Sequence, residues 1–147
     1  MILNAISTNQ LLTIHAIASI WMTSLIWVIQ LVHYPFFQYV DQNKQRLAAN
    51  FHTSRIFWCV FPAMIIEVIT LILYIIQKNQ INEIEITITT LLITIWASTI
   101  LIQVPQHQAM ATQYNQSIIK QLVKKNWIRT ICWTLKTIFT IYLIMTA

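Results

Sequence analysis

The stretch LLTIHAIASIWMTSLIWVIQLVHYPFFQY, residues 11–39, contains no Asp, Glu, Lys or Arg. The hydrocarbon core of a bilayer is about 30 Å thick, and about 20 apolar residues cross it as a helix. Three further stretches reach this length, at residues 51–76, 84–110 and 127–147. The sequence therefore predicts an all-α fold, in which four membrane-spanning helices with short connections form one antiparallel bundle over residues 1–147.

The composition agrees with a membrane protein. Of the 147 residues, 57% are hydrophobic and 9% are charged, whereas about a quarter of an average soluble domain is charged. The chain has no glycine, which excludes the glycine-rich loops that hold phosphates or dinucleotides. Its two cysteines lie inside predicted spans and are interpreted as small buried apolar residues rather than as a disulfide framework.

The placement of Lys and Arg predicts the orientation. Seven of the nine lie on the side of the connections 41–50 and 113–126, and one, Lys78, lies on the other side. The positive-inside rule makes the first side cytoplasmic and places both termini outside. We expect an integral protein of the bacterial inner membrane, whose net charge of +5 faces anionic lipid headgroups and not a nucleic acid.

Residues 113–126 differ from the other connections, because apolar residues and lysines alternate there at helical spacing. This pattern predicts either an amphipathic turn at the membrane surface or the cytoplasmic start of the fourth helix. The residues 41–50 are expected to form a short polar loop. Pro35 is expected to end the regular part of the first helix, and Pro105 is expected to kink the third.

Three of the four histidines lie at the same predicted end of three different helices. His33 ends the first apolar stretch, His52 opens the second, and His107 ends the third. Antiparallel helices would bring these imidazoles together on the cytoplasmic side, where ionisable groups usually have a function. They are candidate ligands of Zn, Cu or Fe, and two of them are candidate axial ligands of haem b. The alternative is that each is an interfacial histidine without a ligand.

Other side chains at helical spacing would line the same pocket: Arg55, Gln103, Asn126, Arg129 and Trp133. We expect Arg55, Gln103 and Trp133 to contact a lipophilic substrate. In the structural alternative, the glutamine bonds across helices, the arginines contact lipid phosphates, and the aromatic ring belongs to the core.

Two charged residues lie deep inside predicted spans. Glu67 is about four turns from His52, and Lys136 is about two turns from Arg129. An unpaired charge in hydrocarbon is costly, so Glu67 and Lys136 are predicted to form a buried ion pair. The pair would be structural or part of a proton or substrate pathway.

The second half of the chain resembles a known family. Val104-Pro105-Gln106-His107 and Asn126-Trp127-Ile128-Arg129 are similar to the Val-Pro-x-Asn and Asn-x-aliphatic-Arg elements of the small four-helix membrane proteins grouped with anthrone oxygenases. His107 stands where that pattern has Asn. The first half, with His33-Tyr34-Pro35 and His52-x-x-Arg55, is similar to a bacterial subgroup.

The resemblance implies oxygenation of an electron-rich ring carbon next to a carbonyl. A histidine such as His107 would then act as general base, and Asn126 or Arg129 would hold the oxyanion.

Two classes of function fit the sequence. The first is a membrane oxidoreductase or oxygenase with a His-rich site for a lipophilic substrate, and a b-type haem protein is a variant of it. The second is a non-catalytic accessory subunit of a larger membrane complex, which the low charge and the lack of a soluble domain favour. A transporter is less well supported, because four spans without an inverted repeat or glycine-broken helices offer little room for alternating access.

Overall fold

The computed structural model describes residues 6–78, 80–112 and 115–146. These residues are helical apart from short connections, and they contain no strand. Within them, four helical segments are long and apolar enough, by length and composition, to cross a membrane. The prediction of an all-α fold with four long helices is confirmed.

The first segment contains α1 (Thr8–Val28), a π-helical turn (Ile29–His33), α2 (Tyr34–Phe36) and a 3₁₀ turn (Phe37–Tyr39). The second is α3 (Gln42–Gln77). The third contains α4 (Glu83–Ser98), a second π-helical turn (Thr99–Gln103) and α5 (Val104–Thr112), and the fourth is α6 (Gln116–Thr146).

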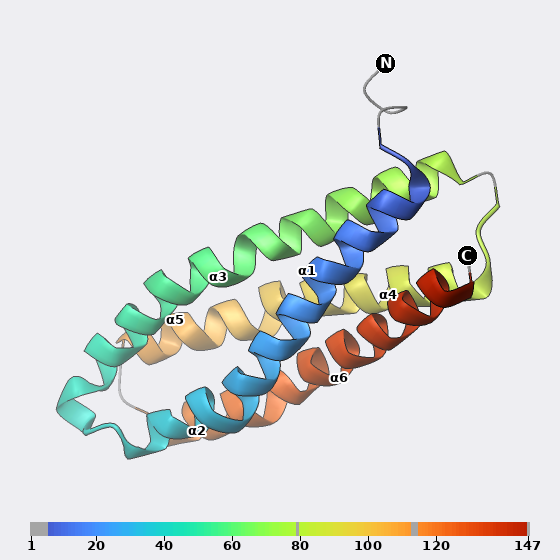
Figure 1. Cartoon of the computed structure of the whole chain (residues 1–147). Helices are drawn as coiled ribbons and strands as arrows, with labels where there is room; N and C mark the ends of the chain where they lie inside the picture. The colour runs from blue at the N-terminus through green and yellow to red at the C-terminus, as the bar shows by residue number, and fades with distance from the viewer. Residues whose placement is uncertain (1–5, 79, 113–114, 147) are drawn as a thin grey trace.

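The segments lie alongside one another, and Figure 1 shows their order in space. The helix α1 contacts α3 and α6, α4 contacts α6, and α3 contacts α5. One end of the molecule holds the start of α1, the end of α3 and the start of α4, and we call it the termini end (Figure 1). At this end, the side-chain amide of Gln77 donates a hydrogen bond to the carbonyl of Ile6 at 3.1 Å. The opposite end, which holds α2 and α5, is the α2–α5 end.

Side-chain caps fix where the helices begin. Asn82 and Glu85 form a reciprocal capping box at the start of α4, and Ser7 and Gln10 form another at the start of α1. Each cap satisfies backbone N–H groups that have no partner in the first helical turn. Asp41 caps α3 by accepting from the Asn43 N–H at 2.8 Å.

The cap at Asp41 corrects the prediction of a polar loop over residues 41–50. The helix α3 begins at Gln42, and Gln45 and Ala49 are already buried, at 1% and 0% exposure. The segment that follows α5 is helical from Gln116 onwards. It is the start of the fourth helix, and residues 113 and 114 lie outside the described residues.

Each π-helical turn is separated from a following proline by one residue. The N–H of Tyr34 donates to the carbonyl of Ile29, and the N–H of Val104 donates to the carbonyl of Thr99. Pro35 and the corresponding Pro105 follow directly. A proline ring clashes with the carbonyl four residues earlier, and a wider π turn moves that carbonyl. The helices therefore continue through both prolines. After each π turn, the side chains point in directions that are rotated about the helix axis from those of a regular α-helix.

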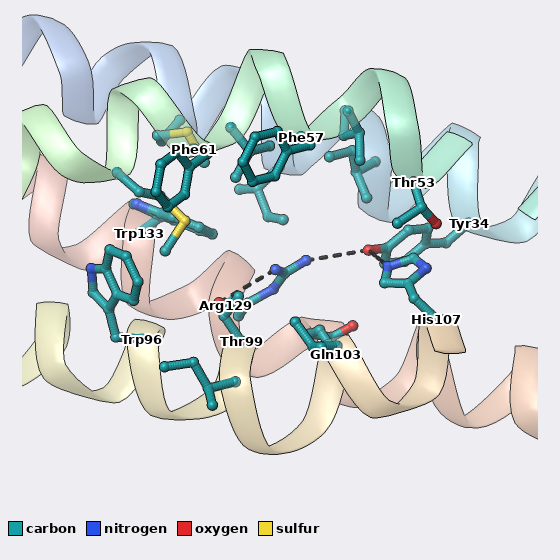
Figure 2. A pocket seen from close by; sticks show the side chains of 18 residues that line it. Tyr34, Thr53, Phe57, Phe61, Trp96, Thr99, Gln103, His107, Arg129 and Trp133 are labelled. Atoms are coloured by element: carbon teal, nitrogen blue, oxygen red, sulfur yellow. Dashed lines mark hydrogen bonds between the residues drawn. The ribbon is translucent and has the colours of Figure 1, made fainter. Parts of the chain in front are cut away.

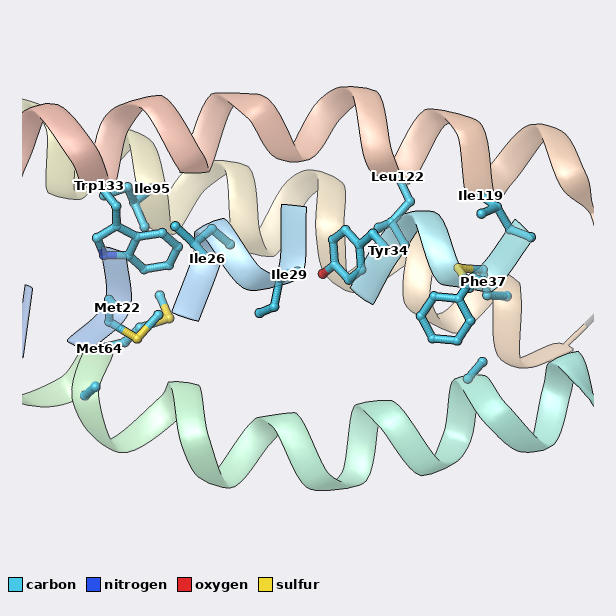
Figure 3. Close-up of a cluster of buried hydrophobic side chains, with 13 residues drawn as sticks. Met22, Ile26, Ile29, Tyr34, Phe37, Met64, Ile95, Ile119, Leu122 and Trp133 are labelled. Atoms are coloured by element: carbon cyan, nitrogen blue, oxygen red, sulfur yellow. The ribbon is translucent and has the colours of Figure 1, made fainter. Parts of the chain in front are cut away.

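Large side chains fill the core near the α2–α5 end. Figure 3 shows Tyr34 and Phe37 beside Ile119 and Leu122, and all four are buried, with no more than 3% exposed. Trp133 continues the same cluster toward the middle of the molecule. Tyr34 directly follows the first π turn, and its ring lies inside this core, next to the candidate functional site.

Candidate functional site

A cavity of about 290 Å³ lies among the helices near the α2–α5 end (Figure 2). Apolar side chains of α1, α3, α4 and α6 form most of its wall, among them Met22, Phe57, Phe61, Trp96 and Trp133. Polar side chains are a minority of the lining: Tyr34, Thr53, Thr99, Gln103, His107 and Arg129. An apolar cavity with a few convergent polar groups is the usual form of a small-molecule site.

The cavity reaches the surface between α3 and the third segment. Phe57 of α3 is 47% exposed, and Ile100 and Val104 of the third segment are 55% and 45% exposed, although all three line the cavity. Its mouth is therefore framed by apolar side chains and opens on the side of the molecule. In a membrane, this position would admit a ligand from the lipid.

Arg129, Tyr34 and His107 form a continuous hydrogen-bonded chain on the cavity wall (Figure 2). The Nη2 group of Arg129 donates to the hydroxyl of Tyr34 at 3.3 Å, and that hydroxyl lies 2.8 Å from His107 Nε2. A guanidinium can only donate, so the Tyr34 oxygen accepts from Arg129. The hydroxyl proton is then available to His107 Nε2, which acts as the acceptor.

Asn126 fixes the guanidinium of Arg129. Its Oδ1 accepts from Nε at 2.9 Å and from Nη2 at 2.6 Å. The Asn126 amide in turn donates to Gln30 at 2.9 Å, and Gln30 donates to the carbonyl of Val123 at 3.1 Å. Buried amides thus hold the cation in one orientation, with Nη1 directed to Thr99 at 3.4 Å.

The charge of Arg129 is buried without an anionic partner. The residue is 6% exposed, and among the described residues the two salt bridges join other side chains. The ring of Trp133 also lies near the cation, with its centroid 5.8 Å from the Arg129 Cζ atom. Buried charges are normally paired, so this cation is suited to a ligand that brings negative charge.

Gln103 provides a second unsatisfied group beside Arg129. It lines the cavity and is 1% exposed. Neither its amide nitrogen nor its amide oxygen has a hydrogen-bond partner among the residues that the structure describes. Buried polar groups are rarely left unpaired, so the Gln103 amide is available to a ligand in the cavity.

The three predicted histidines lie together at the α2–α5 end. The ring centroids of His33 and His52 are 4.3 Å apart, and those of His52 and His107 are 5.3 Å apart. Of the three, His107 alone lines the cavity. The rings are side by side, with interplanar angles of 31° and 34°.

This arrangement gives the metal hypothesis no support. Over the described residues, no group of three or more His, Cys, Asp or Glu side chains is placed to hold a metal ion. The metal and haem assignments stay predictions from the sequence.

The predicted substrate contacts divide into two groups. Gln103 and Trp133 line the cavity with His107 and Arg129. Arg55 does not line it: the residue is exposed, and its guanidinium lies over the ring of Phe51 at 5.6 Å. The assignment of Arg55 to substrate binding stays a prediction, and the cavity gives it no support, because this side chain extends along the surface of α3 and not toward the interior.

Sequence reasoning missed Tyr34 and Thr99. Regular helical spacing allows either His33 or Tyr34 to share the face of Gln30. The structure, with a π turn over Ile29–His33, buries Tyr34. Thr99 is at regular spacing from Trp96 and Gln103 and opens the second π turn. The available signal was the proline after each turn, since π turns are frequent at functional sites.

A second polar cluster lies in the middle of the helices. Lys136 Nζ is 2.6 Å from Glu67 Oε1, and both side chains are fully buried. Lys136 also donates to Ser19 at 2.5 Å, and the indole of Trp133 donates to Glu67 Oε2 at 3.1 Å. The structure thus brings the predicted pair together and surrounds it with further donors and acceptors.

Comparison with known proteins adds no relative. Family models, curated proteins and solved structures give no match to this chain. The function is therefore inferred from the geometry of the site and from the sequence motifs.

Proposed function

We propose that this chain is a membrane-embedded enzyme that binds a lipophilic ring ketone and removes a proton from a ring carbon that the carbonyl activates. This step would begin the oxygenation of that carbon by O₂. One observation carries the proposal: the buried cation of Arg129, which has no carboxylate partner among the described residues, is linked through Tyr34 to His107 on the wall of an apolar cavity.

The proposal includes the membrane arrangement. The four helical segments form an antiparallel bundle across the bacterial inner membrane, with the α2–α5 end at the cytoplasm and both termini outside. Their length and apolar composition support this arrangement. So does the charge distribution, because Lys44, Arg46 and the lysines of residues 120–125 belong to the segments at the α2–α5 end.

Arg129 and Gln103 would bind the ketone oxygen. When the ring carbon loses its proton, the electron pair of the broken C–H bond moves onto that oxygen as an enolate. The guanidinium and the amide N–H of Gln103 stabilise this negative charge. Because Asn126 already holds Arg129 with bonds of 2.9 and 2.6 Å, the donors need little reorganisation as the charge develops.

His107 is the proposed general base. Its Nε2 accepts the proton from the ring carbon, directly or through the hydroxyl of Tyr34, which lies 2.8 Å away. The enolate carbon then bonds to O₂ and forms a hydroperoxide, and loss of water leaves a second carbonyl. In sum, one ring CH₂ and one O₂ give one ring C=O and one H₂O, so the carbon is oxidised and O₂ is reduced without another reactant.

The test uses the purified protein in lipid nanodiscs with anthrone, the simplest fused-ring ketone with an acidic ring CH₂. We expect anthraquinone formation and O₂ consumption above the rate in protein-free nanodiscs. Arg129→Lys and His107→Gln should each lower this added rate at least about 100-fold. The matched control is Arg55→Lys, since Arg55 is exposed and lies outside the cavity. Equal rates in all four proteins, or no rate above the protein-free value, would contradict the proposal.

A further inference from the structure

A second cavity lies next to the first, between α3 and the third helical segment. It has a volume of about 460 Å³ and lies between α3 and α4, nearer the termini end. Trp96 lines both cavities. On α3 the lining passes from Met64 in the first cavity to Val68 in the second, one helical turn later.

The lining of this second cavity is hydrocarbon. Leu71 and Leu92 form its buried floor, and Ile72 and Ile93 form exposed edges at 51% and 63% exposure. The one hydroxyl among the lining residues belongs to Thr89, which donates to the Glu85 carbonyl at 2.7 Å. No lining side chain of this cavity beyond Trp96 has a free polar atom to offer a ligand.

The junction between the cavities carries an unsatisfied donor. Trp96 Nε1 is buried and has no acceptor among the described residues. Figure 2 shows the nitrogen on the side of the Trp96 ring that faces away from His107. A buried indole N–H usually has a partner, so the junction between the cavities is suited to a ligand atom that accepts a hydrogen bond.

We propose that the ligand of this site is a ring carbonyl compound with one long hydrocarbon chain, the ring in the first cavity and the chain in the groove between α3 and α4. The inference rests on the proposed function and adds a substrate class to it. The residues from Val68 to Ile75 cover about 10 Å of helix axis, which accommodates the first several carbons of the chain.

The groove would select the ligand by admitting the chain rather than by attracting it. A chain that leaves lipid for a hydrocarbon groove gains little free energy, because both surroundings are apolar. A ring fixed at Arg129 and Gln103, however, must place its chain somewhere. The open space between α3 and α4 is the continuation of the cavity that the lining residues define.

The test compares two probes with the same ring: 2-methyl-1,4-naphthoquinone and its analogue with a decyl chain. Equilibrium retention is measured on protein-loaded nanodiscs and corrected for protein-free nanodiscs. Ile72→Trp fills the groove, and Ile69→Trp is the matched control, because Ile69 has the same 51% exposure on α3 but does not line the groove. We expect Ile72→Trp to weaken decyl-probe binding at least about tenfold and to leave methyl-probe binding unchanged.

Each other result has a defined meaning. If both probes bind Ile72→Trp as well as they bind the wild type, or if both weaken equally, the chain does not lie in this groove and the inference fails while the proposed site stands. If neither probe binds the wild type, the proposed site fails and the inference fails with it. A photoreactive diazirine at the end of the decyl chain should label peptides of α3 and α4, and labelling confined to α1 or α6 would overturn the inference.

Discussion

Two buried polar clusters lie on the inner faces of α6, and they differ in how completely the protein satisfies them. At Lys136, the cation meets the carboxylate of Glu67 at 2.6 Å, and Ser19 and Trp133 complete the contacts. At Arg129, the cation meets amide and hydroxyl oxygens but no carboxylate of the described residues, and a cavity lies beside it. The first cluster is closed by the chain itself, whereas we propose that the second is completed by a ligand.

We therefore expect the Lys136 cluster to contribute mainly to stability and the Arg129 cluster mainly to function. A closed ion pair in an apolar interior holds helices in register, and breaking one side of it leaves a buried charge. An open cation beside a cavity stabilises the fold less, but it provides a charge that a ligand can use. The predictions below test the comparison by changing one cluster at a time.

The largest effect on stability is expected from Lys136→Met. It leaves the Glu67 carboxylate buried without its cation and should lower the free energy of unfolding by about 3–5 kcal/mol. The double variant Glu67→Leu/Lys136→Met should be more stable than Lys136→Met alone, because it removes both charges. Denaturation in detergent micelles measures the three proteins. A double variant that is less stable than the single variant would show that the pair does not act as a unit.

A smaller effect is expected from Gln103→Leu, which should increase stability and weaken ligand binding. The substitution removes two buried amide atoms that have no partner in the described part of the chain. It should raise the free energy of unfolding by up to about 1 kcal/mol and weaken binding of the naphthoquinone probe about tenfold. Retention on nanodiscs and thermal unfolding check the two changes. Unchanged binding would remove Gln103 from the proposed site.

The smallest effect is expected at the ion pair of Lys78 and Glu85 at the termini end, where Lys78 is partly exposed and Glu85 is buried. The hydrogen bond from Lys78 to Glu85 raises the pKa of the Lys78 amine above its ordinary value. The pair therefore adds its stability below the ordinary lysine pKa and loses it as pH rises through the raised value. Without Lys78, the Glu85 carboxylate still accepts from the Tyr74 hydroxyl and from the Asn82 N–H, each at 2.8 Å. Lys78→Met should therefore lower the melting temperature slightly at neutral pH and by less in strong alkali. A difference that grows with pH would contradict this sign.

The four helices and the Glu67–Lys136 pair could be predicted from the sequence, because both follow from strong energetic rules. Long uncharged stretches define the four helical segments, and two lone charges in such stretches must meet, as Glu67 and Lys136 do. The grouping of the three histidines could also be predicted, since connectivity alone puts them at one end. These inferences needed only the length and the order of the elements.

The orientations of the side chains around Arg129 could not be predicted in the same way. His33 and Tyr34 both lie within reach of the Gln30 face by helical spacing, and the spacing alone does not decide between them. The structure, with a π turn before Pro35, buries Tyr34. Arg55 shares a helix with cavity residues but points to the surface. The orientation of one side chain depends on packing across helices, which a single sequence does not display.

The most direct test of the comparison is to measure both stability and probe binding for Arg129→Met and Lys136→Met. The account predicts that Arg129→Met weakens binding of the naphthoquinone probe at least about 100-fold while it lowers the free energy of unfolding by less than Lys136→Met does. Lys136→Met, measured under conditions where it is still folded, should bind the probe within about threefold of the wild type. If Arg129→Met instead destabilises the protein as much as Lys136→Met and binds the probe normally, Arg129 is a structural residue and the central claim is contradicted.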